Sequence, residues 1–197
     1  MPAVKIRTGV FGGSFNPIHN GHVALARRLL GVASLDEVWF VVSPRNPLKQ
    51  ESQLAADKLR LEMVRIALEG EPRLVACDYE FGLPRPSYMW HTLQGLAADY
   101  PDREFVLIIG SDNWACFDEW FAHDDIISSF PIVVYPRPGY AVDAESLPPG
   151  VTLADVAMMD ISSTEVRRRI ASGMSVEGIL PHGVWRFIVG NHLYGAV

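Results

Sequence analysis

Short apolar runs alternate along the chain with longer segments of helical periodicity. Six runs rich in β-branched and aromatic residues predict strands, because such residues fit a buried, pleated backbone. They lie at residues 5–11, 37–42, 73–77, 104–109, 131–135 and 156–161. The run at 104–109 is the most apolar of them, so we expect that strand to be central and covered on both faces.

Segments with apolar residues spaced three and four apart lie between these runs and predict helices. They span residues 19–30, 53–68, 88–98, 163–171 and 181–189, with one further helical stretch before 131. This alternation predicts an α/β fold: a Rossmann-like, doubly wound, mostly parallel sheet flanked by helices.

The whole chain is interpreted as one domain. Residues 1–160 would form the sheet core, and 161–197 a small C-terminal helical part. The stretch 136–149 is rich in Pro, Gly and acids, and is interpreted as a long surface loop rather than a domain boundary.

Composition narrows the function classes. The 197 residues are 49% hydrophobic and 20% charged, which is ordinary for a globular protein. A net charge of −6 gives no general positive field for nucleic acid, so we expect no nucleic-acid partner. Apolar runs such as 105–109 are far too short to span a membrane. Cys77 and Cys116 form no CxxC pair, which fits a reducing cytoplasm.

The first predicted strand leads into GGSFNPIHNGH, residues 12–22, which opens the first helix. Gly12 and Gly13 lack a Cβ, so a phosphate can approach their N–H groups closely. His19 and His22 would share one face of the helix start, where the helix dipole attracts anions. The pair could instead be one capping and one core histidine. A metal site would need a third ligand, and none stands nearby.

A second anion-binding helix start is predicted at ISSTEVR, residues 161–167. Ser162 and Glu165 have the spacing of a capping box. Ser163 and Arg167 are four residues apart and share a face, where hydroxyl, N–H and guanidinium groups could hold an anion. The two arginines that follow rotate away from that face and are interpreted as solvated.

These two segments resemble the HxGH nucleotidyltransferase superfamily, and the full-length pattern is most similar to bacterial nicotinate-nucleotide adenylyltransferases. The resemblance implies that the adenylyl group of ATP is transferred to nicotinic acid mononucleotide, with release of pyrophosphate, in NAD biosynthesis. ATP would be the co-substrate, with Mg²⁺ held mainly by its phosphates and no metal site of the protein's own. A cytoplasmic enzyme, which could form homo-oligomers, is expected.

The resemblance also assigns the ATP side of the site. The residues it assigns to ATP are Gly12, Gly13, Ser14, Phe15, His19, His22, Gly110, Asp112, Ser162, Ser163, Thr164 and Arg167. Lys49 lies in a Pro-braced loop and could present a charge to a phosphate, although Leu48 stands where the family often has His. The residues expected to stabilise the charge of the reacting phosphates are His19, His22, Lys49 and Arg167.

The acceptor side is assigned in the same way. Ser87, Tyr88 and Met89 resemble the PSYT segment that contacts the nicotinate ring and carboxylate, partly through main-chain N–H groups. Met89 replaces the usual Thr, so a hydroxyl contact would be lost. Trp120 would stack on the pyridine ring. Arg137, in an RPG turn, would contact a ligand or brace its loop.

Other readings stay open at this point. A sibling transferase could use nicotinamide mononucleotide, phosphopantetheine or a cytidylyl-transfer substrate as its acceptor. A nucleotide sensor without catalysis could also use this fold. A hydride-transfer enzyme fits poorly, because the glycine spacing is not GxGxxG, and the P-loop pattern is absent as well.

Overall fold

The computed structural model describes residues 4–44, 54–157 and 161–196. The elements, with η for short 3-10 helices, are β1 (Ile6–Gly13), α1 (Asn20–Val32), β2 (Glu37–Val42), α2 (Asp57–Ala67), β3 (Leu74–Cys77), η2 (Tyr79–Gly82), α3 (Met89–Asp99), β4 (Arg103–Gly110), α4 (Ser111–Trp114), η3 (Phe117–Glu119), α5 (His123–Ser129), β5 (Ile132–Tyr135), η4 (Ala144–Ser146), β6 (Val151–Leu153), α6 (Ser163–Ala171), α7 (His182–Gly190) and η5 (Leu193–Gly195).

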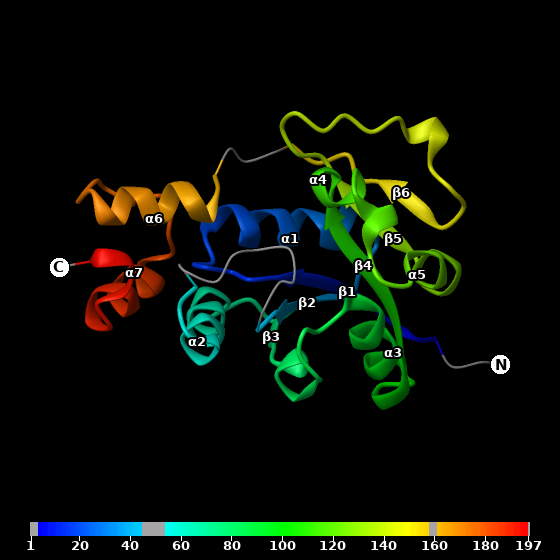
Figure 1. The fold of residues 1–197 in the computed structure, drawn as a ribbon, viewed down its shortest axis with the longest axis horizontal. Helices are drawn as coiled ribbons and strands as arrows, with labels where there is room; N and C mark the ends of the chain where they lie inside the picture. Colours follow the sequence, from blue (N-terminus) through cyan, green and yellow to red (C-terminus); the bar gives the residue numbers. More distant parts are fainter. Residues whose placement is uncertain (1–3, 45–53, 158–160, 197) are drawn as a thin grey trace.

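The described residues form one six-stranded sheet in the order β3-β2-β1-β4-β5-β6 (Figure 1). Every strand pairs in parallel with its neighbours. The winding direction reverses between β1 and β4, which confirms the doubly wound, Rossmann-like fold. In open sheets of this kind, ligands bind beyond the carboxyl ends of the strands at the reversal point.

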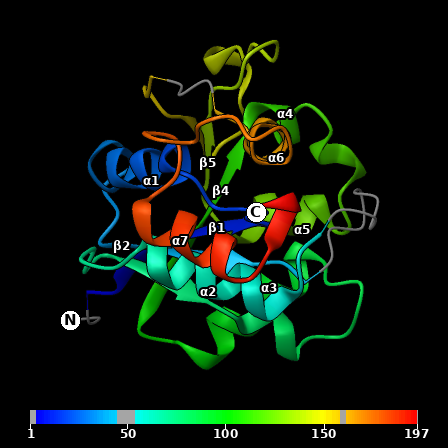
Figure 2. The same ribbon diagram turned by 90° about the vertical axis from the view of Figure 1, so that its left-hand side faces the viewer.

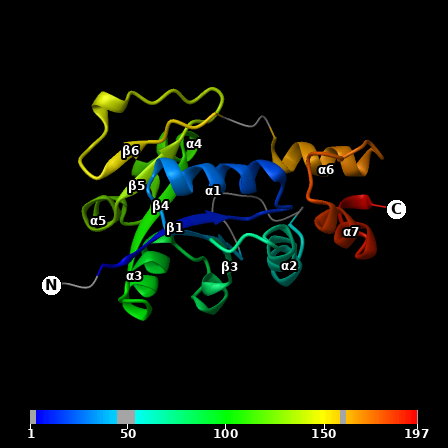
Figure 3. The same ribbon diagram turned by 180° about the vertical axis from the view of Figure 1, so that it is seen from behind.

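Alternate residues of each strand pack on opposite faces of the sheet. On one face Phe11 and Phe40 pack in a cluster with Leu29 of α1, and Figure 3 shows α1 lying along β1. On the other face Val10 packs in a second cluster with Leu93 of α3. Both faces of the central strands are therefore covered, as the apolar run at 104–109 predicts.

The C-terminal helices α6 and α7 lie together at one end of the molecule (Figures 1 and 2). Val166 and Ile188 are buried in the same cluster as α1. The hydroxyl of Ser163 donates to the main-chain oxygen of Pro17 at 2.9 Å. The start of α6 is therefore held against the loop that precedes α1.

The position of the sixth strand differs from the sequence prediction. The strand was predicted at 156–161, but β6 lies at Val151–Leu153, and residues 154–157 form no strand. The pairing register explains this: Val134 pairs with Leu153, the N–H of Ala154 donates to Val134, and β5 ends one residue later. Beyond Ala154 the chain has no strand left to pair with. Residues 158–160 lie outside the described part of the chain.

The other predicted strands and helices are present and differ from the prediction only at their ends, while α4 and the short 3-10 helices were not predicted. The helix predicted from residue 53 begins at Asp57, and residue 53 itself is not described. The segment 136–149 holds only η4 and a single bridge between Arg137 and Tyr140. In the described ranges, no helix is both long and apolar enough to cross a lipid bilayer.

Candidate active site

A cleft in two halves opens where β1 and β4 end. The larger cavity has a volume of about 630 Å³ and the smaller cavity about 280 Å³. Both are lined by residues 11–14, Asp112, Asn113 and Tyr135, so the two cavities are contiguous. The cleft lies at the reversal point of the sheet, where this fold places ligands.

Most of the residues singled out in the sequence line this cleft. Those lining the larger cavity are Gly12, Gly13, Ser14, Phe15, His19, His22, Asp112, Arg137, Ser162, Ser163, Thr164 and Arg167. Those lining the smaller cavity are Gly12, Gly13, Ser14, Ser87, Tyr88, Met89, Gly110, Asp112 and Trp120.

Arg137 and Lys49 are the exceptions among the expected residues. Arg137, expected on the acceptor side, lines the larger cavity and is absent from the lining of the smaller one. Lys49 lies outside the described residues.

The two histidines stand at the first turn of α1. His19 occupies the capping position with an extended backbone, and His22 is the third residue of the helix. Their rings stack with centroids 3.7 Å apart. The main-chain N–H of His19 donates to Nδ1 of His22 at 3.2 Å. Because Nδ1 accepts, a neutral His22 carries its proton on Nε2.

His19 is almost completely buried. Only 4% of it is exposed, and its Nδ1 has no hydrogen-bond partner. A Cβ at position 21 would lie 3.0 Å from that nitrogen, so Gly21 leaves room for the ring. Burial first, and then the positive charge of Arg137, lower the pKa of His19 to about 3. His19 is therefore neutral at physiological pH and contributes hydrogen bonding rather than charge.

Arg167 brings a guanidinium to the larger cavity from α6. Ser162 caps this helix, its Oγ accepting from the N–H of Glu165 at 3.2 Å, as the sequence predicts. Nη1 of Arg167 donates to the main-chain oxygen of Asn16 at 2.8 Å. Its Nε is buried without a partner. The guanidinium is thus tied to the loop before α1 while it keeps an unused donor.

A buried carboxylate shapes the loop on the acceptor side. Glu80 is 3% exposed and accepts hydrogen bonds from the hydroxyls of Ser87 at 2.7 Å and Thr92 at 3.0 Å. The only hydroxyl proton of Ser87 is therefore engaged, and Ser87 fixes the start of α3. A Cβ on Gly12 would lie 2.7 Å from the terminal methyl of Met89, so Gly12 makes space for that side chain.

Two residues that line the cleft, Asp112 and Trp120, each have an unpaired polar atom. Nε1 of Trp120 and Oδ1 of Asp112 are buried without a hydrogen-bond partner. Asp112 lies close over the main chain at the end of β4, because a Cβ on Gly110 would approach its Oδ1 to 2.2 Å. Buried polar atoms usually have partners, so these two are natural contact points for a ligand.

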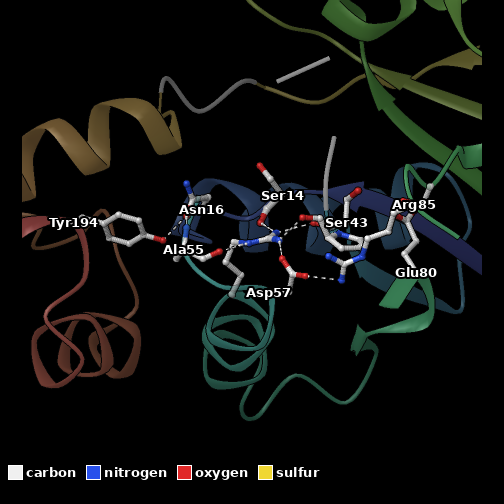
Figure 4. A network of polar contacts seen from close by, with 11 residues as sticks. Ser14, Asn16, Ser43, Ala55, Asp57, Glu80, Arg85 and Tyr194 are labelled. Carbon is white, nitrogen blue, oxygen red and sulfur yellow. Dashed lines mark hydrogen bonds and ion pairs between the residues drawn. The ribbon is translucent and has the colours of Figure 1, made fainter. Parts of the chain in front are cut away.

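Arg60, a fully buried arginine of α2, is not among the residues predicted from the sequence. At distances of 2.5–3.1 Å it donates to the main-chain oxygens of Ser14, Ser43, Pro44 and Ala55 and to the carboxylate of Asp57. Figure 4 shows Ser14, Ser43 and Asp57 close together at the centre of this network.

A signal for Arg60 exists in the sequence. Met63, Val64 and Ala67 follow Arg60 at spacings of three, four and seven, the pattern of a buried helix face. A charged residue at the first position of such an apolar helix face indicates that its side chain is buried and paired. Arg60 joins the loop after β1 to the loop after β2, and Asp57 extends the network to Arg85 at 2.9 Å.

Comparison with known proteins agrees with this geometry. The model of the cytidylyltransferase-like family matches residues 10–169. A relative from Bacteroides fragilis, named "Probable nicotinate-nucleotide adenylyltransferase", is 52% identical over 94% of this chain and 92% of its own. A protein of the same name from Bacteroides thetaiotaomicron is 50% identical over 93% of this chain and 91% of its own.

A solved structure shows the same fold. The Plasmodium falciparum nicotinic acid mononucleotide adenylyltransferase, complexed with NaAD, superposes with a TM-score of 0.80. It is 18% identical, and the match covers 95% of this chain and 97% of that one. With the two relatives above, these matches show that the chain belongs to the nicotinate-nucleotide adenylyltransferases of the cytidylyltransferase-like family.

Proposed function

We propose that the cleft carries out the reaction of this family on nicotinic acid mononucleotide. The adenylyl group of ATP passes to the mononucleotide phosphate, giving nicotinic acid adenine dinucleotide and pyrophosphate. The observation that carries the proposal is the convergence of His22 of α1 and Arg167 of α6, two helices far apart in sequence, on one cavity of about 630 Å³. That cavity takes the triphosphate, and the smaller cavity takes the acceptor.

The chemistry needs no covalent intermediate. An oxygen of the acceptor phosphate forms a bond to the α-phosphorus of ATP, and the bond to the β-phosphate oxygen breaks, its electron pair leaving with pyrophosphate. A phosphate is already anionic near neutral pH, so no general base is required. Catalysis then consists of positioning and charge stabilisation.

Three residues supply that stabilisation in our proposal, and a fourth, His19, orients one of them. His22 donates from Nε2 and Arg167 from its guanidinium to the reacting phosphates, while neutral His19 orients His22 through their stacked rings. Lys49 assists as a further cation. The remaining ATP contacts come from the glycine loop, Asp112 and the hydroxyls that begin α6.

The donor set fits a magnesium ion that ATP itself carries. In the described ranges, no three His, Cys, Asp or Glu side chains are grouped to hold a metal. Asp112, with its unpaired Oδ1, is the acid that lines the larger cavity. Mg²⁺ bound to phosphates keeps several waters and needs few carboxylates from the protein, so the phosphates of ATP would hold it and Asp112 could add one oxygen. When bound, the ion neutralises phosphate charge.

The acceptor is held in our proposal by Ser87, Tyr88, Met89 and Trp120, with main-chain N–H groups at the start of α3 binding the nicotinate carboxylate. Arg137 acts on the ATP side, because it lines only the larger of the two cavities. We also infer that residues 161–197 belong to the same domain as the sheet, since Val166 and Ile188 complete the core around α1.

The test is the reaction itself, with the products identified by mass. The full chain is incubated with ATP, Mg²⁺ and each of nicotinic acid mononucleotide, nicotinamide mononucleotide and phosphopantetheine. Formation of nicotinic acid adenine dinucleotide at the highest kcat/KM is expected. A better rate with another acceptor would make the chain a sibling transferase, and ATP binding without any product would make it a sensor.

Replacing His22 tests the proposed role of the first helix start. His22→Ala is expected to lower kcat about 10²- to 10³-fold, the usual cost of one well-aimed donor. His182→Ala is the matched control, because His182 is exposed on α7 and lines neither cavity. Near-normal turnover in a folded His22→Ala protein would remove His22 from the mechanism.

A further inference from the structure

Asn16 joins three segments of the chain beside the larger cavity. Its Oδ1 accepts from the N–H of Ala55 at 3.1 Å and from the hydroxyl of Tyr194 at 2.6 Å (Figure 4). Its main-chain oxygen accepts from Nη1 of Arg167 at 2.8 Å. Asn16 is 3% exposed, so these bonds lie where water competes little. The loop before α1, the segment before α2 and the C-terminal η5 therefore meet at one side chain.

The backbone next to Asn16 is strained. Phe15 has a φ of 43°, in the left-handed region that bulky residues avoid. Its ring packs edge-on against His22 with centroids 5.2 Å apart. Such a conformation persists only where surrounding contacts hold it. Hydrogen bonds hold the residues on both sides of Phe15. Asn16 follows it and makes the bonds described above, and Ser14 precedes it and accepts from Arg60.

Tyr194 is itself held in an unusual conformation. Its φ is 57°, again left-handed, and its ring packs against the core that includes α6 and α7. Burial raises the pKa of Tyr194, with Arg167 and Arg60 acting in the opposite direction. The hydroxyl is therefore protonated near neutral pH and always able to donate. The strained backbone of Tyr194 places its hydroxyl within hydrogen-bond distance of Asn16.

We propose that Tyr194 is a positioning residue for the ATP side of the cleft. Its hydroxyl holds Asn16, and Asn16 in turn holds the Phe15–His22 contact and the guanidinium of Arg167. Tyr194 is absent from the lining of both cavities, so it acts through these groups and not on the substrate. The inference rests on the proposed function, because it assigns the larger cavity to the phosphates of ATP.

The test removes one oxygen. Tyr194→Phe keeps the ring and its packing, so the protein is expected to fold, which circular dichroism and a thermal melt check. Loosening the loop is expected to lower kcat/KM for ATP about tenfold, because small misplacements of reacting groups cost large factors in rate. The KM for the mononucleotide is expected to stay unchanged, since the acceptor residues line the other cavity. A general loss of structure would instead move both parameters.

Tyr79→Phe is the matched control. The Tyr79 hydroxyl also donates to a side-chain oxygen, Oδ2 of Asp99 at 2.7 Å, but it lies outside the lining of both cavities and away from Asn16. Its kinetic constants are expected to match wild type. If Tyr194→Phe keeps kcat/KM for ATP within twofold of wild type, or if it raises the KM values of ATP and the mononucleotide equally, the positioning role is wrong.

Calorimetry with ATP and Mg²⁺ separates this proposal from the proposed function. Wild type that binds no ATP would overturn the function, whatever Tyr194 does. Wild type that binds ATP also allows a cycle with Asn16→Ala. Once Asn16 is truncated, Tyr194→Phe is expected to weaken ATP binding no further. Fully additive losses in that cycle would overturn the route through Asn16.

Discussion

The larger cavity and the smaller cavity differ in charge. Two guanidiniums, Arg137 and Arg167, and the two stacked histidines face the larger one. Among the described residues that line the smaller one there is no Lys, Arg or His, while the acids Glu80 and Glu119 line this cavity and not the larger one. Asp112 lines both cavities. One cleft thus presents cationic and hydrogen-bonding side chains to one half and aromatic and acidic side chains to the other.

This difference separates two ways to bind an anion. A triphosphate carries several charges, and guanidiniums with unused donors match it. In our proposal, a single nicotinate carboxylate in the smaller cavity relies on main-chain N–H groups, such as those at the start of α3, which Glu80 fixes through Ser87. The positive charge of the cleft is concentrated in the larger cavity, to which we assign the triphosphate.

The largest effect is expected from removing a cation of the larger cavity. Arg167→Ala is expected to lower kcat about 10²- to 10³-fold, because it deletes a donor aimed at developing charge. The adjacent Arg168 pairs with Glu165 at 2.7 Å on the exposed side of α6, so Arg168→Ala is the matched control with near-normal turnover. If the two variants lose kcat equally, the net positive charge of α6 is what supports turnover, and Arg167 has no specific role.

The next effect is a pH dependence of stability. His19 has a folded-state pKa of about 3 against 6.5 when unfolded. Below pH 6.5 the His19 imidazole is protonated in the unfolded chain but stays neutral in the folded chain. The free energy of unfolding therefore falls as pH decreases toward 3. The loss at pH 5 is about 2 kcal/mol.

Urea unfolding at pH 7.5 and pH 5 measures this loss. His19→Gln removes the titrating group and should flatten the dependence. If wild type and the variant lose stability in parallel, the buried ring is not the cause.

The smallest effect is expected on the acceptor side. Trp120→Ala should raise the KM for nicotinic acid mononucleotide by a factor of about 2 to 12, the equivalent of about 0.5–1.5 kcal/mol of stacking. The KM for ATP should not change. Steady-state kinetics with each substrate varied in turn gives both values, and an unchanged mononucleotide KM would argue against stacking.

Local pattern was sufficient for much of the fold. Five of the predicted strands and the parallel, doubly wound arrangement follow from side-chain periodicity, and the Ser162 cap follows from its spacing to Glu165. The last strand was misplaced because an apolar run does not show where a partner strand ends. That limit is set by Tyr135, the last residue of β5.

The site divides in a similar way. Residues in contiguous motifs, such as His22 and Arg167, could be found from the sequence, because their types and spacings match anion binding. The partners of Tyr194 and Arg60 could be identified only in space, because they belong to distant loops and are mostly main-chain oxygens. The apolar stripe of α2 indicates that Arg60 is buried, but it does not show which groups Arg60 binds. Arg137 lines the larger cavity and not the smaller one, and a turn motif alone does not show which cavity its side chain faces.

Arg60 has a consequence for substitution at its position. All five N–H groups of a guanidinium are committed there, four of them to peptide oxygens of the loops that follow β1 and β2 or precede α2. An ammonium group offers three donors from a single atom, so lysine would keep the charge and still abandon at least two acceptors. The shape of the donor, more than its charge, makes arginine irreplaceable there.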